Sequence, residues 1–372
     1  MPSLGAREWL LQPKVRLERA TAREVIKLTV RIGINGFGRI GRNFLRSLLE
    51  LEAAPGDGAD IELVAINDLV SLEANMHLLR YDSTFGRLGV SVTRTDKGFR
   101  VGEREVTVFE EKDPKAIGWG SLGVDVVIES TGRFTSREAA SGHLEAGAKR
   151  VIISAPGKEA DNTFVVGVND DTFDPAHDFV VSAASCTTNC LVPMVKVLDD
   201  AFGLRQGLMT TVHAYTNDQS VLDLGRDNLR RARAAAVNII PSTTGAARST
   251  SLVLAAMKGR LDGQSLRVPV PDGSITDLTA ILGAKVGAAE INEAFKAASE
   301  TDRLRGVLVY NTDEIVSSDI VGSSASCTFD STLTMTIAVD DSTTLAKVLG
   351  WYDNEWGYSH RLVDLAKIIG AV

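Results

Sequence analysis

One cysteine near the middle of the chain has the surroundings of a nucleophile. Cys186 lies in the segment Ser-Cys-Thr-Thr-Asn-Cys (185–190), between an apolar strand-like run and an apolar helical run at 191–198. A thiol in the first turn of a helix meets unpaired backbone N–H groups, which stabilise the reactive thiolate. The same groups could bind an oxyanion. We therefore predict that Cys186 performs nucleophilic catalysis, and we assign no chemistry to Cys190 or Cys327.

A nucleophilic cysteine needs a base, and His213 is the candidate. It stands near the end of an expected strand at 208–214, where a rigid backbone could hold the imidazole against the thiol. We interpret the remaining histidines as structural because they are scattered: His77, His143, His177 and His360. We expect no metal site, because the sequence lacks C-x-x-C, H-x-x-x-H and runs of acidic ligands.

A glycine-rich turn near the start of the chain predicts dinucleotide binding. It has the pattern G-x-G-x-x-G, directly after a strand pattern and before a helical one, and consists of Gly36, Phe37, Gly38, Arg39, Ile40 and Gly41. Glycines permit the tight turn and let the backbone approach a pyrophosphate, which the N-terminus of the following helix then binds.

Asp68 follows the next apolar strand, at 61–67, where an acidic residue can hold the hydroxyls of a ribose. Its separation from the turn exceeds the usual ~20 residues, and a turn-rich segment at 54–58 accounts for the excess. The carboxylate would repel a 2′-phosphate, and Leu69 offers no compensating donor. The sequence therefore favours NAD over NADP.

Alternating strand and helix patterns must position these residues. Before Cys186, helical segments at 40–49 and 137–146 fall among apolar strand patterns at 28–34, 61–67, 124–128, 151–153 and 179–181. This order indicates a mostly parallel sheet covered on both faces. After Cys186 strands outnumber helices, which is typical of an α+β domain; they are expected at 208–214, 266–270, 278–282, 307–310, 334–339 and 344–352, before a last helix at 360–369.

Composition limits the remaining function classes. The 372 residues carry a net charge of −8 and are 44% hydrophobic, which excludes a disordered chain and a broadly basic surface. We therefore expect neither nucleic acid nor membrane as a partner. Three cysteines and no signal-like or spanning apolar segment favour the cytoplasm. Residues 1–27 form an N-terminal extension to which we assign no role.

A set of motifs then occurs in order along the chain: NGFGRIGR (35–42), SCTTNC (185–190), HAYTNDQ (213–219), RRARAAA (230–236), STTGAA (242–247) and WYDNEWGYS (351–359). From about residue 28 to the end, the chain resembles the phosphorylating glyceraldehyde-3-phosphate dehydrogenase family. The resemblance implies an α/β fold with a Rossmann-type doubly wound parallel-sheet NAD domain (28–185 and 354–372). It also implies an α+β catalytic domain with a mostly antiparallel sheet (186–353).

The resemblance also implies an activity, in which D-glyceraldehyde 3-phosphate is oxidised to 1,3-bisphosphoglycerate through a Cys186 thiohemiacetal and thioester, with His213 as base. Positions that match contacts to the two phosphates are Ser185, Thr187, Thr216, Asp218, Thr244, Gly245 and Arg267. Beyond the glycine turn, positions that match NAD contacts are Asp68, Thr131, Gly132, Ser154 and Asn354. In this family the chain forms a homotetramer, with the segment around 214–237 at a subunit interface.

Three departures from the family pattern stand out. Arg248 replaces a common lysine and keeps its charge, and Gly225 replaces a proline of NAD-specific members, which leaves room for some NADP use. The N-terminal extension is the third. Two alternatives stay open: an erythrose-4-phosphate dehydrogenase, and a catalytically silent NAD-binding or adhesion protein. The phosphate-loop match at 242–247 argues against the first, and intact Cys186 and His213 argue against the second.

Overall fold

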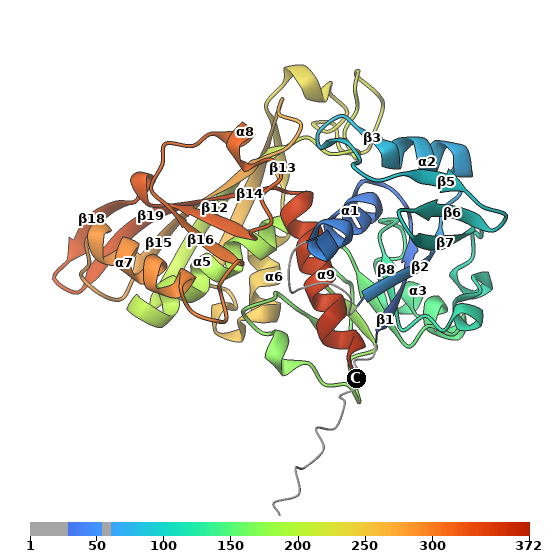
Figure 1. Ribbon diagram of the computed structural model, residues 1–372. Coiled ribbons are helices and arrows are strands. Elements are labelled where there is room, and N and C mark those ends of the chain that lie inside the picture. The colour runs from blue at the N-terminus through green and yellow to red at the C-terminus, as the bar shows by residue number, and fades with distance from the viewer. Residues whose placement is uncertain (1–28, 54–60) are drawn as a thin grey trace, which may run out of the picture.

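The computed structural model of the chain describes residues 29–53 and 61–372 (Figure 1). The expected N-terminal extension and the turn-rich segment at 54–58 lie outside the described residues. Two sheets organise the rest, one built mainly from the first half of the chain and one from the second.

The first sheet has nine strands in the order β10-β11-β9-β8-β1-β2-β7-β6-β5. The strands from β10 to β7 are parallel, and β6 and β5 extend the sheet as an antiparallel edge. Their bounds are β1 Val30–Asn35, β2 Ile61–Asn67, β5 Val92–Arg94, β6 Gly98–Val101, β7 Arg104–Phe109, β8 Val126–Glu129, β9 Arg150–Ile153, β10 Asn162–Thr163 and β11 Val180–Ser182.

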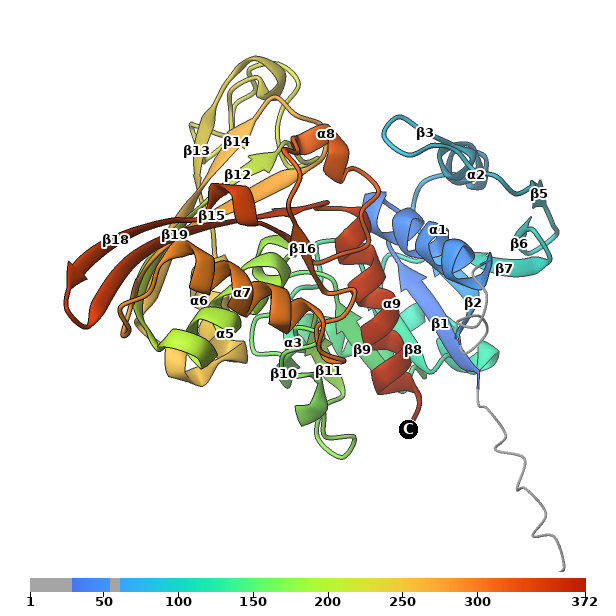
Figure 2. The same ribbon diagram turned by 60° about the vertical axis from the view of Figure 1, so that its left-hand side comes forward.

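Side chains on both faces of the first sheet are buried, which explains why its strands read as continuous apolar runs. On β8, Val126 and Ile128 point to one face and pack with α1 (Arg39–Ala53) and α9 (Trp356–Gly370). Val127 points to the other face and packs around Trp119. The last helix of the chain therefore lies against α1 and the first sheet, far in sequence from both (Figure 2).

One helix of the first half differs from expectation. The single helix expected at 137–146 is two short helices, α3 (Arg137–Ala140) and α4 (Gly142–Glu145), which break at Ser141. A Cβ added at Gly142 would lie 3.1 Å from Pro114, so the break accompanies a close approach of two segments. The sequence also did not predict α2 (Leu72–Arg80) or the pair β3 (Tyr81–Asp82) and β4 (Gly86–Arg87).

The second sheet has the order β13-β14-β12-β15-β19-β17-β16, with β18 beside β19. Its pairs are antiparallel except β12 with β14 and β16 with β17, so the expected mostly antiparallel sheet is confirmed. The bounds are β12 Leu204–Ala214, β13 Ile240–Thr243, β14 Leu261–Val268, β15 Ser274–Leu282, β16 Leu308–Asn311, β17 Cys327–Asp330, β18 Met335–Asp340 and β19 Thr343–Tyr352.

Helix α5 (Cys186–Phe202) connects the two regions and is almost wholly buried. It packs on β12, β15, β17 and β19 and forms the core of the second region with α6 (Ala246–Val253) and α7 (Ala288–Ser299). The remaining short helices are α8 (Ser317–Ile320) and the 3-10 turns Pro114–Ala116, Trp119–Leu122, Asp170–Thr172, Ala235–Val237, Ala255–Met257 and Ser331–Leu333.

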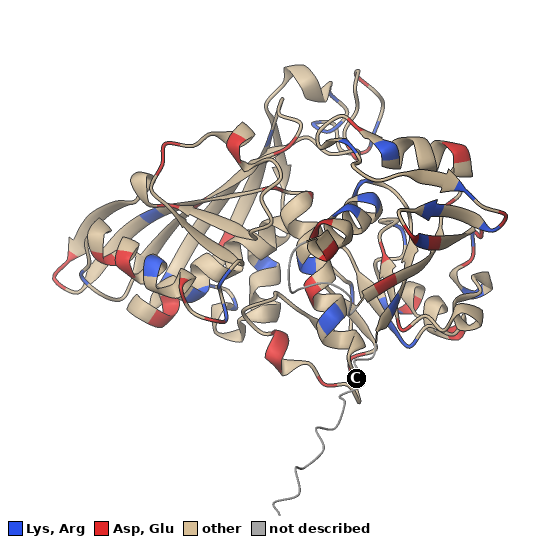
Figure 3. Cartoon of the chain, viewed as in Figure 1, with Lys and Arg blue, Asp and Glu red and all other residues tan. Residues whose placement is uncertain are grey.

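Acidic and basic residues alternate along the chain in the cartoon of Figure 3, and both kinds occur in each half of the molecule. Within residues 29–53 and 61–372, no helix combines the length and apolar character needed to cross a bilayer.

Candidate active site

Cys186 is the first residue of α5, as the sequence predicts. Ser185 caps the helix, because its Oγ accepts a hydrogen bond from Thr188 N at 3.1 Å. The backbone enters this turn through Ala184, whose φ of 56° lies in the left-handed region. A non-glycine residue there costs about 1 kcal/mol or more, so the surrounding structure holds the turn in a strained geometry that presents the half-buried thiol.

His213 lies beside the thiol, near the end of β12. Its Nε2 is 3.4 Å from Cys186 Sγ, and the imidazole is buried with 4% exposed. The other ring nitrogen, Nδ1, lies 2.7 Å from the carbonyl oxygen of Ala214. A carbonyl can only accept, so this contact favours a proton on Nδ1, whereas Arg267 Nη1, 2.8 Å from the same nitrogen, can only donate and favours a proton on Nε2. The tautomer with the proton on Nδ1 is the one that turns the Nε2 lone pair toward the thiol.

Burial shifts the pKa values of both the Cys186 thiol and the His213 imidazole. Burial raises the pKa of the Cys186 thiol to about 11, against the opposing effects of Arg267 and of the Thr187 N–H and hydroxyl. Burial and then Arg267 lower the pKa of His213 to about 3. Burial therefore favours a thiol beside a neutral imidazole in the ligand-free chain and opposes the thiolate, which the N–H groups in the first turn of α5 and Arg267 favour.

Tyr352 is a neighbour of this pair that the sequence did not single out. Its hydroxyl lies 2.8 Å from Thr187 Oγ1 and 2.7 Å from Thr211 Oγ1, and its ring meets the edge of the His213 ring at 5.9 Å between centroids. It thus ties the start of α5 to β12 at the end of β19. Its only sequence signal is its place inside the motif at 351–359.

A group of donors adjoins His213 on the side away from the thiol. Arg267 Nη1 lies 2.8 Å from His213 Nδ1 and donates to the Ala214 carbonyl at 3.1 Å and to Thr216 Oγ1 at 3.3 Å. Arg267 Nε is buried and has no partner among the described residues. Arg267 is half-buried, and a guanidinium with an unsatisfied N–H is a ready ligand for an oxyanion such as phosphate.

Asp218 stands at the same place but presents no donor of its own. Its carboxylate accepts from Thr216 Oγ1 and pairs with Arg231. Arg231 Nε also donates to Ser242 Oγ at 2.8 Å. Asp218 is therefore a residue that orients neighbouring donors.

Thr244 and Gly245 form the N-terminus of α6. Thr244 Oγ1 accepts from Ala246 N at 3.2 Å, Gly245 caps the helix without a side chain, and a Cβ added there would meet nothing within 4 Å. This helix end is open to an anion. In contrast, the hydroxyls of Ser185 and Thr187 already bond within the protein, to Thr188 and Tyr352.

The glycine turn opens onto a second site. Gly36 has a φ of 92°, which only glycine adopts without strain, and a Cβ at Gly41 would lie 2.4 Å from Gly36 O. Gly38 faces open space, with nothing within 4 Å of an added Cβ. The backbone N–H groups of Arg39 and Ile40 have no partner among the described residues. The turn thus offers an open backbone and free donors, which fit a dinucleotide pyrophosphate.

A cavity of about 570 Å³ lies beside this turn. Its lining includes four of the expected cofactor residues, Gly36, Gly38, Asp68 and Thr131, and extends to Phe134. Asp68 Oδ2 accepts from Phe37 N at 2.6 Å, so the carboxylate stands at the mouth of the turn. These residues fit the pyrophosphate and ribose of NAD.

The other expected cofactor residues lie on several different elements. Gly132 follows Thr131 with a φ of 69°, and Ser154 ends β9, with its N–H donating to Glu129 O at 3.0 Å. The Arg39 side chain is bound by Glu355 and Asp82, which leaves its backbone for a ligand. Asn354 Oδ1 accepts from Ser274 Oγ at 2.7 Å, while its Nδ2 donates to no described residue.

A buried polar network beneath the cavity was missed by sequence reasoning. Glu129 accepts from Asn35 Nδ2 at 2.6 Å and from Thr131 N at 2.9 Å, and it lies 2.9 Å from His143 Nε2. Trp119 Nε1 donates to the other His143 nitrogen at 3.1 Å. The charged residue inside an otherwise apolar strand at 126–129 was the available signal, since a buried carboxylate needs such partners.

No group of histidine, cysteine and acidic residues suited to a metal ion occurs within the described ranges.

The chain matches two family models. One is described as glyceraldehyde 3-phosphate dehydrogenase, NAD binding domain, and covers residues 30–137; the other is the C-terminal domain of the same enzyme and covers residues 185–354.

Similar proteins carry the same description. A glyceraldehyde-3-phosphate dehydrogenase of Streptomyces coelicolor is 57% identical over 343 residues, covering 92% of this chain and 99% of the relative. Relatives of the same name from Mycobacterium tuberculosis and Geobacillus stearothermophilus are 54% and 52% identical, with the same coverage.

Proposed function

Since the chain belongs to the glyceraldehyde-3-phosphate dehydrogenase family, we propose that Cys186 is the nucleophile and His213 the base of its reaction. The enzyme is an NAD-dependent oxidoreductase that converts D-glyceraldehyde 3-phosphate and phosphate to 1,3-bisphosphoglycerate. The observation that carries the assignment is the contact of 3.4 Å between Cys186 Sγ and His213 Nε2. In the tautomer that donates from Nδ1 to the Ala214 carbonyl, Nε2 is free to accept the thiol proton.

The neutral pair implies a defined proton path. As Sγ attacks the aldehyde carbon, the thiol proton passes to Nε2 and is then given to the developing alkoxide, which yields the thiohemiacetal. His213 next takes the hydroxyl proton. A bound NAD would supply the hydride acceptor for this carbon, and Cys186 would then hold the oxidised acyl group as a thioester. A phosphate oxygen attacks the thioester, the carbon–sulfur bond breaks, and the sulfur recovers the proton held on Nε2.

The start of α5 provides the oxyanion donor. The backbone N–H of Cys186 has no partner among the described residues, since Ser185 and its neighbours satisfy only later N–H groups of the turn. Preorganised N–H donors of this kind are worth about 3 kcal/mol each in acyl transfer.

Two anion sites flank this centre. We assign the phosphate of the substrate to Arg267 and Thr216, oriented by Asp218, because Arg267 Nε is buried and free. We assign inorganic phosphate to Thr244, Gly245 and the open N-terminus of α6. Ser185 and Thr187, at the start of α5, would complete this phosphate site.

The cofactor residues follow from the cavity beside the glycine turn. The turn from Gly36 to Gly41 would hold the pyrophosphate, Asp68 the ribose hydroxyls and Asn354 the nicotinamide carboxamide. The wall of the NAD site would be completed by Thr131, Gly132 and Ser154. Gly225 is exposed in an open loop, where a Cβ would meet nothing within 4 Å, and this supports some NADP use.

The packing of α9 on α1 supports a division into an NAD domain (28–185 and 354–372) and a catalytic domain (186–353), with residues 1–27 as an extension.

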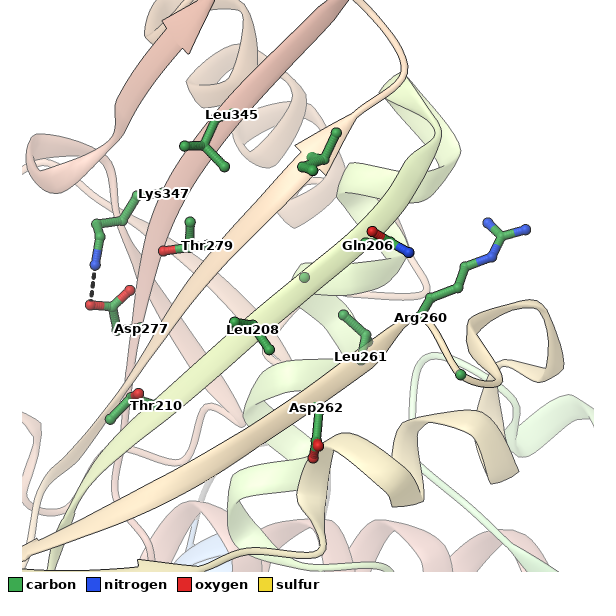
Figure 4. Close-up of a pocket in the computed structure, with 13 residues that line it drawn as sticks. Gln206, Leu208, Thr210, Arg260, Leu261, Asp262, Asp277, Thr279, Leu345 and Lys347 are labelled. Carbon is green, nitrogen blue, oxygen red and sulfur yellow. Dashed lines mark hydrogen bonds and ion pairs between the residues drawn. The ribbon is translucent and has the colours of Figure 1, made fainter. Parts of the chain in front are cut away.

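We also propose a cytoplasmic homotetramer. The face of the second sheet opposite α5 carries an open cavity of about 690 Å³ where Leu208 is 68% exposed and Lys347 pairs with Asp277 (Figure 4). Light scattering of wild type and Leu208→Asp, which measures the molar mass of each in solution, would test the proposed homotetramer. A monomeric wild type would contradict the assembly.

The function is tested by NADH formation from D-glyceraldehyde 3-phosphate with and without phosphate, repeated with NADP. We expect sustained turnover only with phosphate, and phosphate-independent turnover would contradict the phosphorylating mechanism. Cys186→Ser should abolish turnover and still bind NAD. Cys327→Ser, which changes a buried cysteine that contacts Cys190 and to which no chemistry is assigned, is the matched control and should retain turnover.

A further inference from the structure

Two buried aspartates meet where the second sheet approaches the candidate nicotinamide residue. Asp272 lies between β14 and β15, and Asp353 lies between β19 and α9. Each is 1% exposed, and the pairing of Ser274 with Tyr352 brings both to the same end of β15 and β19, where each carboxyl affects the pKa of the other. Two carboxylates both lack a donor, so a hydrogen bond between them requires a proton on one of the two.

The surrounding donors identify which one. Asp353 Oδ1 accepts from Glu355 N at 2.8 Å and Trp356 N at 2.6 Å, and its Oδ2 accepts from Gly322 N at 2.7 Å. Three N–H donors stabilise an ionised carboxylate. Among the described residues, only Gly273 N donates to Asp272, at 2.8 Å, and no group donates to its buried Oδ2. The proton therefore belongs on Asp272 Oδ2.

We propose that Asp272 works as a positioning residue in its protonated form, donating to Asp353 and thereby fixing the segment that carries Asn354. Two successive contacts join the same backbone segments. Asp272 meets Asp353, and Ser274 Oγ donates to Asn354 Oδ1 at 2.7 Å, while Ala214 N donates to that same Ser274 Oγ at 3.1 Å. The proposal rests on the role assigned above to Asn354.

The neutral form also suits the reaction electrostatically. Burial, then Asp353 and Glu355, raise the pKa of Asp272 to about 9. An ionised Asp272 raises the pKa of the Cys186 thiol, so a neutral carboxyl leaves the sulfur easier to ionise. Of the other charged groups nearby, Glu355 is bound by Arg39, and Asp319 of the adjoining α8 accepts from Val316 N.

Above the pKa of Asp272 the two carboxylates repel, so NAD affinity is expected to fall as pH rises through about 9. Asp272→Asn keeps a donor to Asp353 at every pH. It should bind NAD as wild type does at pH 7.5, and should lose the affinity change between pH 8 and 10. Asp272→Ala removes the donor and should weaken NAD binding roughly tenfold at both pH values.

A second readout needs no cofactor. An acid whose pKa is raised by folding makes the protein less stable as pH rises from its unfolded pKa to its folded one. Asp272→Asn removes this penalty, so its Tm should exceed that of wild type by more at pH 8 than at pH 5. Asp178→Asn, at another buried aspartate that accepts from Asp174 N at 2.9 Å, is the control and should show no widening gap.

The outcomes separate the two claims. A Tm difference that does not change with pH would show that Asp272 is ionised and would overturn the proposal. A widening gap with NAD affinity unaffected in both Asp272→Ala and Asn354→Ala would instead reject the role of Asn354. Equal impairment of Asp272→Asn and Asp272→Ala at pH 7.5 would also overturn the positioning role.

Discussion

His213→Ala gives the sharpest test of the proton path. In wild type the thiol proton passes to Nε2 across 3.4 Å, and the two pKa values of about 11 and about 3 lie on either side of neutrality. Neither group then titrates at intermediate pH. The rate of NADH formation in the first turnover should be nearly flat between pH 6 and 8.5.

Without the imidazole, the thiolate must form by direct ionisation. A pKa of about 11 leaves about one thiol in a thousand ionised at pH 8. The loss of a positioned base costs about 10²–10⁴-fold in rate, which agrees with that fraction. The variant rate should therefore fall by about three orders of magnitude at pH 8 and rise roughly tenfold for each pH unit up to 10.

The assay is rapid mixing of enzyme, NAD and D-glyceraldehyde 3-phosphate without phosphate, with absorbance of NADH as the signal. His177→Ala removes a surface histidine that pairs only with Asp174, and it should match wild type. A His213→Ala burst as fast as that of wild type, or one that does not change with pH, would refute the role of His213.

Three further predictions concern the cofactor side and the anion site. Gly41→Ala should lower Tm, because the new Cβ would lie 2.4 Å from Gly36 O. Gly38→Ala should leave Tm unchanged and weaken NAD binding, because its Cβ would enter the open space of the cavity. Calorimetry and NAD titration check both variants, and equal losses of Tm would contradict this packing. Glu129→Leu should destabilise the protein by about 3 kcal/mol in urea unfolding, because it leaves His143 Nε2 and Asn35 Nδ2 without their acceptor; an unchanged midpoint would show that the network is not needed. Arg267→Ala should raise KM for D-glyceraldehyde 3-phosphate at least tenfold while NAD binding stays unchanged, and steady-state kinetics with an unaltered KM would remove Arg267 from the phosphate site.

Sequence patterns predicted the elements that have one clear period. The strand at 61–67 matches β2, and the glycine turn with its helix matches the start of α1. The patterns failed for β5, β6 and β7, which form one end of the sheet; β5 and β6 are only three and four residues long and carry exposed charges, Arg94 and Arg100. They also failed at Ser141, where the break in the helix accompanies a close approach of Gly142 to Pro114, a residue distant in sequence.

The site shows the same division. Cys186 and the glycine turn could be predicted locally, because each lies at a helix start that its own neighbours specify. The protonation of the Cys186–His213 pair could not, since it depends on burial by segments as distant as β19. Glu129 and Asp272 were missed for the same reason: each is defined by partners that folding brings from elsewhere in the chain.

The central claim is that Cys186 alone carries the acyl group. The direct measurement is peptide mass spectrometry of the enzyme after NAD and D-glyceraldehyde 3-phosphate are added without phosphate and the reaction is quenched in acid. The account predicts one 3-phosphoglyceryl thioester per chain, on Cys186, which disappears when phosphate is added before the quench. An adduct on Cys190 or Cys327, or NADH formed with no adduct on Cys186, would contradict it.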